Sequence, residues 1–179
     1  MEVAGRIFFK ARFQAVIAFL LFFLAVTKAA NAKPDLVISG SVSVTPTTVA
    51  PGKKVRLGAV TVKNRGTEST RKGFFIGYYL STDATITKSD RSLGRTTIKT
   101  LLKAGESKTV SPPPLTIPSN QAPGSYHIGV LADFANSVPE SNEGNNTAST
   151  KITVAKPDLV ISGSLSVTPT TVAAGKTVR

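Results

Sequence analysis

The chain has 179 residues, 41% of them hydrophobic and 18% charged, which suits one ordinary domain and is too short for two full ones. It contains no cysteine and a single histidine, so a disulfide framework is excluded and a Cys–His or Ser–His nucleophile has little basis. With 22 Lys and Arg against 10 Asp and Glu the chain favours acidic partners, but its basic residues are dispersed, which is typical of a solvated surface, and no nucleic acid is expected to bind.

Residues 1–32 have the three parts of a secretory signal peptide. Basic residues precede the apolar run AVIAFLLFFLAV, Ala15 to Val26, and an A-x-A arrangement at Ala30 to Ala32 follows it. The alternative is a permanent anchor, but the run has 12 residues where a membrane-spanning helix needs roughly 20. The sequence therefore predicts a signal-peptide helix that is cleaved after Ala32, and a secreted, extracellular or cell-surface protein with no stable membrane anchor.

The stretch KPDLVISG occurs twice, at 33–40 and 156–163. Residues 33–56 and 156–179 differ at three of 24 positions, namely Val42/Leu165, Pro51/Ala174 and Lys54/Thr177, and are offset by 123 residues. Solenoid repeats are typically about 20–50 residues long, so this offset predicts tandem domains. We expect one domain over 33–155. We expect residues 156–179 to be the truncated start of a second repeat, in a truncated reading frame or a fragment of a longer tandem protein. Such a segment is too short for a core, so we expect it to be disordered or loosely docked.

Seven short runs between turn signals follow one another in residues 33–155. They are DLVISGSVSVTP, KKVRLGAVTVKNRG, GFFIGYYLSTD, SLGRTTIKTLL, ESKTVSPPPLTIP, APGSYHIGVLADF and NNTASTKITVA. The first should end at Pro46, and the second changes its apolar phase across Gly58, which predicts a β-bulge. The third is apolar on both faces and should be the central core strand, while Pro112 to Pro114 should confine the fifth to an edge or a kink.

No run after residue 32 has a helical period, so the predicted fold is all-β, an immunoglobulin-like or fibronectin-like antiparallel β-sandwich of about seven strands. In PGSYHI, Gly124 lies two residues before Tyr126 and Ile128 two after, which is the arrangement of a tyrosine corner. Ile128 would then pack against the second strand where antibody domains place a cysteine. An ordinary inward tyrosine is the alternative.

Acidic and amide residues gather in two loops that are candidates for Ca²⁺ binding. They are Asp83 and Asp90 in STDATITKSD, and Asp133, Glu140, Glu143 and Asn145 in ADFANSVPESNEGNN. Strand direction should place the two loops at opposite poles, so each would need its own ligands, and neither has the D-x-[DN]-x-[DN]-G pattern. Turn formation through hydrogen bonds from backbone amides is the favoured interpretation, Ca²⁺ the weaker one, and no other cofactor is expected.

Neither nucleophilic nor glycosidase chemistry is expected from the remaining residues. His127 should point to the outer face of its strand, and strand periodicity places no two carboxylates together across a cleft. A sequon begins at Asn145, which a host with that glycosylation machinery would use.

Three segments, KPDLVISG, VKNRGTESTRKGFFIGYYLSTDATITKSDRSLG and APGSYHIGVLADFANSVPESNEGNNT, carry a resemblance over nearly all of Lys33 to Ala155. They resemble the CARDB family, the cell-adhesion-related domain found in bacteria; YYLSTD with a loop aspartate and VPESNEGNN are the most specific parts. The resemblance implies an immunoglobulin-like, non-enzymatic module, usually present in tandem copies in large exported proteins and often attached to peptidases or glycan-active enzymes.

Two hypotheses of function follow. The first is an extracellular structural or cell-adhesion module of a tandem-repeat protein, with neighbouring domains or cell-surface and extracellular polymers as partners and with Pro157 holding neighbours at a semi-fixed angle. The second is a carbohydrate-binding or Ca²⁺-dependent ligand-binding domain with an exposed aromatic platform. Only Phe74, Phe75, Tyr78 and Tyr79 could form one, and they are better explained as core, so the first hypothesis is favoured.

Overall fold

The computed structural model describes residues 32–156, 158, 162–163, 171 and 173–175. The predicted signal peptide, apart from Ala32, lies outside the described residues, and so does most of the predicted second repeat. Within the described part, no helix is long and apolar enough to cross a membrane.

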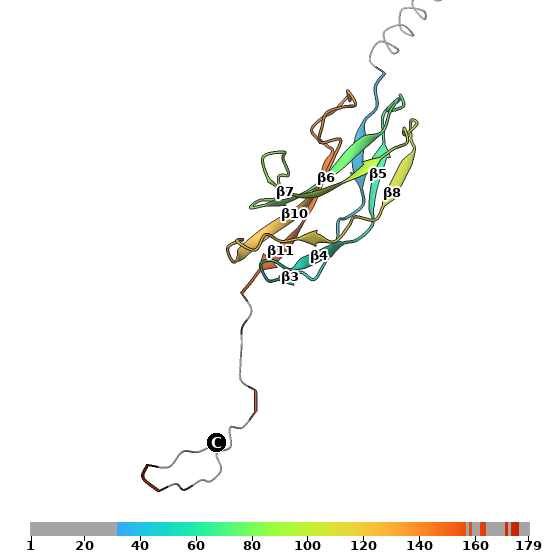
Figure 1. Cartoon of the computed structure of the whole chain (residues 1–179). Coiled ribbons are helices and arrows are strands. Elements are labelled where there is room, and N and C mark those ends of the chain that lie inside the picture. Colours follow the sequence, from blue (N-terminus) through green and yellow to red (C-terminus); the bar gives the residue numbers. More distant parts are fainter. Residues whose placement is uncertain (1–31, 157, 159–161, 164–170, 172, 176–179) are drawn as a thin grey trace, which may run out of the picture.

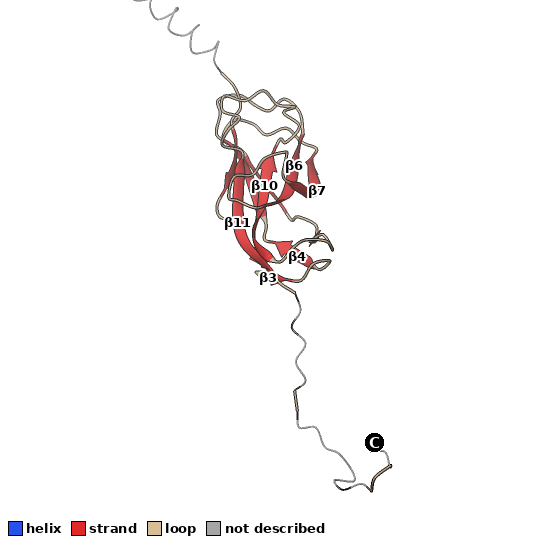
Figure 2. Cartoon of the chain, turned by 90° about the vertical axis from the view of Figure 1, so that its left-hand side faces the viewer, coloured by secondary structure: helices blue, strands red, loops and turns tan. Residues whose placement is uncertain are grey.

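The domain is built from strands alone, and no described segment is helical (Figure 2). The strands are β1 (Leu36–Ser39), β2 (Val44–Thr45), β3 (Thr48–Val49), β4 (Lys54–Leu57), β5 (Val60–Asn64), β6 (Phe74–Ser81), β7 (Arg91–Ile98), β8 (Ser107–Val110), β9 (Leu115–Thr116), β10 (Gly124–Ala132) and β11 (Thr147–Val154). One layer is a five-stranded sheet in the order β3-β11-β10-β6-β7, antiparallel except for β3 beside β11. The other layer consists of the sheets β1-β5-β8 and β2-β4-β9, and the two layers form the predicted all-β sandwich (Figure 1).

Each long strand of the second layer is broken in its middle. Gly40 to Ser43 separate β1 from β2, Gly58 and Ala59 separate β4 from β5, and Ser111 to Pro114 separate β8 from β9. Two of the breaks are joined, because the Gly58 N–H donates to the carbonyl oxygen of Ser43 at 2.9 Å. A Cβ at Gly58 would overlap the Ser43 hydroxyl, so a larger residue here would require the Ser43 side chain to move.

The run is interrupted at Gly58, where a β-bulge was predicted. The predicted edge position of the proline-containing run is confirmed, since β8 and β9 are both edge strands. Seven predicted runs thus account for ten strands, and β3 was missed. It has only two residues, and its sheet partner β11 lies about 100 positions later in the chain, beyond the reach of local patterning.

The inward side chains of both layers form one buried core. In β4 and β5 the side chains of Val55, Leu57, Val60 and Val62 are all buried, so the change of phase across Gly58 keeps both halves of the run facing the core. Full burial of one such side chain contributes about 1.5–3 kcal/mol. Ile128 is completely buried in the same cluster as Val60 and Val62, in agreement with its predicted place.

The predicted tyrosine corner is present. The hydroxyl of Tyr126 donates to the carbonyl oxygen of Ala122, four residues upstream, at 3.0 Å. The ring of Tyr126 packs against the core while its hydroxyl fixes the chain as it enters β10.

Candidate functional site

The polar residues singled out in the sequence lie mainly at one end of the sandwich, which we call the entry pole. Here residues 32–35 lead into β1, flanked by the β5–β6 connection (65–73) and the β10–β11 loop (133–146) (Figure 1). The exit pole is the opposite end, where β11 finishes.

The entry segment, Lys33 to Leu36, is held along its whole length. The carbonyl oxygens of Lys33, Pro34 and Asp35 accept N–H groups of Thr67, Ser141 and Arg65 at 3.0, 2.9 and 2.7 Å, respectively. The N–H groups of Asp35 and Leu36 donate to the side chains of Asn64 and Glu140. The segment is thus fixed on both sides before β1 begins.

Gly66 lies directly against this segment. A Cβ at Gly66 would overlap the backbone of Lys33, Pro34 and Asp35. The close approach of two backbones explains glycine here, since any larger residue would push the entry segment away.

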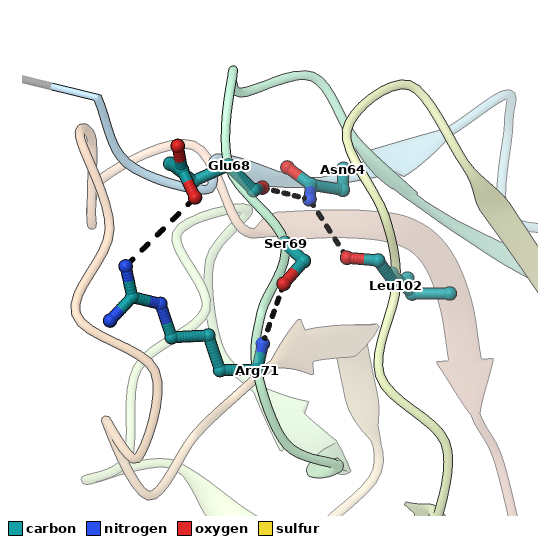
Figure 3. A network of polar contacts seen from close by, with 5 residues as sticks. All are labelled: Asn64, Glu68, Ser69, Arg71 and Leu102. Carbon is teal, nitrogen blue, oxygen red and sulfur yellow. Dashed lines mark hydrogen bonds and ion pairs between the residues drawn. The ribbon is translucent and has the colours of Figure 1, made fainter. Parts of the chain in front are cut away.

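Asn64 is the polar centre of the entry pole and is fully buried (Figure 3). Its Oδ1 accepts the N–H groups of Asp35 at 3.1 Å and Gly66 at 3.0 Å. Its Nδ2 donates to the carbonyl oxygens of Glu68 at 2.7 Å and Leu102 at 3.1 Å. One side chain therefore ties together the entry segment, the β5–β6 connection and the connection between β7 and β8.

Beyond Asn64, the loop 68–71 closes on itself (Figure 3). The Arg71 N–H donates to Ser69 Oγ at 3.3 Å, and the Arg71 guanidinium lies 3.9 Å from the Glu68 carboxylate. The two charged side chains are 81% and 42% exposed, so water screens this pair and it contributes little to stability. A pocket of about 220 Å³ lies between this loop, residues 32–34, Val138 and Pro139.

The predicted metal candidates of the β10–β11 loop come together, but their oxygens accept hydrogen bonds. Asp133 is 1% exposed; its Oδ1 accepts the Ser137 N–H and hydroxyl at 3.1 and 2.7 Å, and its Oδ2 accepts the Val138 N–H at 2.7 Å. Glu143 Oε1 accepts the Glu140 N–H at 2.9 Å. These are the turn-forming contacts that the sequence analysis weighed against Ca²⁺.

Asn145 and Glu140 reach across to the entry segment. Asn145 Nδ2 donates to Asp35 Oδ1 at 2.9 Å, so the acceptor nitrogen of the sequon is engaged in the folded domain. Glu140 is 4% exposed; its Oε2 accepts the Leu36 N–H, and its Oε1 accepts Asn146 Nδ2 at 2.8 Å.

Burial raises the pKa of Glu140 from 4.5 to about 7, opposed by the Leu36 N–H and reinforced by the negative charge of Glu143. A carboxylate in this position therefore changes its charge close to neutral pH.

The other two metal candidates lie at the opposite end of the sheet, as predicted. β6 and β10 are antiparallel, so Asp83 and Asp90 follow the end of β6 near the start of β10. Asp83 Oδ1 accepts the Thr85 N–H, and Asp90 Oδ2 the Thr87 N–H, both at 2.7 Å. In the part of the chain that the structure describes, no group of three or more His, Cys, Asp or Glu could hold a metal ion.

The outer face of the five-stranded sheet has a second, smaller apolar cluster. Gly129 of β10 pairs with Tyr79 of β6, and a Cβ at Gly129 would overlap the side chain of Ile86 from the β6–β7 loop. A Cβ at Gly77 would crowd the rings of Tyr79 and Phe134. Ile86 and Tyr79 are each 5% exposed, so this loop and Phe134 cover the outward side of β6.

The aromatic residues considered for a binding platform divide between the two faces. Phe74 and Tyr78 belong to the core, as expected. On the outer face, Phe75 lies 5.9 Å from Phe134 between ring centroids, tilted by 41°, and Arg95 stacks over Phe75 at 5.0 Å. His127 is on the same outer face and half-buried, beside Ser81 and Lys151 in the register.

A family model for CARDB matches residues 33–150. The chain belongs to the CARDB family. The resemblance noted in KPDLVISG, YYLSTD and VPESNEGNN is thereby confirmed, and the VPESNEGNN segment of this CARDB domain is the loop that holds the entry segment.

Several solved structures are similar to this CARDB chain. One is the CARDB domain of a Pyrococcus furiosus protein in complex with di-metal ions, 24% identical with a TM-score of 0.49, covering 70% of this chain and 97% of that one. Another is a domain of a putative cell surface protein from Methanosarcina acetivorans, 25% identical with a TM-score of 0.46, covering 70% and 95%. A β-glucosidase from Listeria innocua in complex with glucose is 21% identical with a TM-score of 0.42, and the match spans 17% of that enzyme. No curated protein matches the chain.

Sequence reasoning missed the parts of Asn64, Gly66 and Glu140 in holding the entry segment. The available signal was NRG at the end of the β5 run, since an Asn side chain at a strand end can accept the backbone N–H two residues later and so form a turn. Leu36, which Glu140 holds in the entry segment, lies 104 residues away, and no local pattern indicates this pair.

Proposed function

We propose that this CARDB domain is a non-enzymatic extracellular module, a structural or cell-adhesion unit of a tandem-repeat exported protein. Its partners are neighbouring domains or cell-surface and extracellular polymers. The observation that carries the proposal concerns the acidic residues of the β10–β11 loop. The carboxylates of Asp133, Glu140 and Glu143 accept hydrogen bonds from backbone N–H groups of the domain itself. These contacts support a structural role for the loop, which is to hold the chain where it enters the sandwich.

Ligand binding is the second candidate, and one observation favours it. Phe75 and Phe134 are half-buried on the outer face and Arg95 stacks over Phe75. Aromatic rings with adjacent polar groups suit a sugar. The rings are tilted and the guanidinium already covers one of them, which argues against a flat, open platform.

Glycan-array binding and melting of residues 33–155, with and without Ca²⁺, test both candidates. The structural proposal expects no saturable sugar binding and an unchanged melting temperature with Ca²⁺. Binding to a defined sugar that Phe134→Ser abolishes and Lys108→Ser leaves intact would overturn it in favour of the second candidate. A Ca²⁺-dependent rise in melting temperature that Asp133→Asn or Asp90→Asn removes would identify a metal-dependent domain.

Export is tested separately. We expect the protein from an expressing bacterium to be recovered outside the cytoplasm with Lys33 as its first residue, measured by mass spectrometry of the intact chain. Recovery of the chain from the cytoplasm with residues 1–32 still attached would contradict the predicted localisation.

A further inference from the structure

The exit pole holds the chain up to Ala155. The N–H of Thr153 donates to the carbonyl oxygen of Thr47 at 2.8 Å, and the N–H of Ala155 to that of Val49 at 3.0 Å. On the other side, Val154 pairs with Gly124 of β10. Ala155 is therefore still part of the sandwich.

The sequence that follows Ala155 is the sequence that enters the sandwich. Residues 156–159 repeat Lys33 to Leu36. In the first copy each of these four residues makes a backbone hydrogen bond to the entry pole, beginning at Lys33, whose carbonyl oxygen accepts the Thr67 N–H. A further copy of residues 33–155 placed directly after Ala155 would hold its first lysine in the same way.

No free residue then separates two consecutive sandwiches. Ala155 is bonded to the first through its N–H, and the next lysine is bonded to the second through its carbonyl oxygen. The torsions left between these bonds are φ and ψ of Ala155 and φ and ψ of the lysine. The proline that follows fixes its own φ and restricts the lysine to extended conformations. Two compact bodies joined in this way meet at their poles.

The surfaces that meet are a pocket on the entry side and a turn on the exit side. On the entry side lies the pocket of about 220 Å³ between residues 32–34, the loop 68–71 and Val138–Pro139. On the exit side, the turn Ala50 to Lys53 projects beside Ala155, and the Gly52 N–H ties it to the carbonyl oxygen of Ile117 at 2.9 Å. Lys53 is exposed on this turn, and the pocket holds the 42% exposed Glu68 beside the 81% exposed Arg71.

We propose that the entry-pole pocket is the docking site for the exit pole of a preceding copy of the same domain, so that consecutive copies form a stiff rod. The inference rests on the tandem arrangement of the proposed function. The test below measures the geometry between two joined copies. Its outcome therefore does not depend on what the domain binds or where it is exported.

The test protein has two copies of residues 33–155, with Ala155 of the first followed directly by Lys33 of the second. Every residue of the buried core lies between Leu36 and Val154, so each copy carries its own core. The chain has no cysteine, which makes a single Pro139→Cys, placed in either copy, the only thiol. We expect this thiol to react about tenfold or more slowly in the second copy, because its pocket is covered and must first open. Lys108→Cys, exposed on β8, should react equally in both copies.

Interdomain distances complete the test. Spin labels attached at Lys108→Cys in both copies should give one narrow distribution of label-to-label distances. The reference for its width is the distance distribution between labels at Lys88→Cys and Lys108→Cys within a single domain. An eight-residue Gly-Ser spacer at the junction, with an r.m.s. span of about 16 Å, should broaden it. Gly66→Ala in the second copy displaces the entry segment and should also broaden it, whereas Gly124→Ala, whose added Cβ meets only ordinary contacts, should not. Equal reactivity of the Pro139→Cys thiol in the two copies would overturn the proposal. So would a distance distribution in the directly joined protein as broad as that of the protein with the spacer, when both are well folded.

Discussion

The pH dependence of stability is expected to trace to Glu140. Its carboxyl is 4% exposed, and its pKa rises from 4.5 to about 7 on folding. An acid with a raised pKa in the folded state binds more protons folded than unfolded, so its contribution to stability is complete below about pH 4.5. That contribution is lost as the pH rises and is gone above about pH 7. A shift of this size corresponds to about 3 kcal/mol.

Glu140→Gln removes this titration while keeping an oxygen for the Leu36 N–H. We expect the free energy of unfolding of the wild type, measured by urea denaturation, to fall by about 3 kcal/mol relative to Glu140→Gln between pH 4.5 and pH 7.5. Glu106→Gln, which removes an exposed carboxylate, serves as the matched control and should leave the wild-type pH profile unchanged. Parallel profiles for the wild type and Glu140→Gln would refute the assignment.

Three further substitutions test the fold. Asn64→Ala leaves buried N–H and carbonyl groups unpaired and should lower the unfolding free energy by about 3 kcal/mol. Amide hydrogen exchange should become faster at the entry segment. Faster exchange in β5 alone would contradict the assignment of Asn64 as the link between β5 and the entry segment. Tyr126→Phe removes the hydrogen bond to Ala122 and should cost about 1 kcal/mol by denaturant titration, and an unchanged stability would show that the corner is dispensable. Gly129→Ala should cost about 1–3 kcal/mol because its Cβ overlaps Ile86, and adding Ile86→Ala should recover part of that loss; strictly additive losses would refute the contact.

Patterns within single runs predicted most of the fold. The alternation in the β10 run places Ile128 and Val130 inward, and the structure buries both completely. The phase change at Gly58 and the prolines after Val110 marked two of the three places where the second layer breaks. These features depend on residues adjacent in sequence, so local pattern was sufficient.

The entry pole depends on residues far apart in the chain. The acidic residues of the β10–β11 loop were recognised as a group, but Glu140 accepts the N–H of Leu36, 104 positions earlier, and Asn145 bonds Asp35, 110 positions earlier. Composition suggests that such a loop is rich in hydrogen-bond acceptors. Only the closing of the sandwich decides which donors they receive.

The bond from Leu36 to Glu140 also has a consequence for aggregation. β1 lies at the margin of its sheet, and a margin with unpaired N–H groups is a template on which another chain adds a strand. A protein with consecutive copies of the same domain would present that template at high local concentration. Here a side chain of the same domain already occupies the first donor of β1, and above about pH 7 it carries a negative charge there. The residue that positions the incoming chain thus also covers the first N–H at which another strand could add to β1.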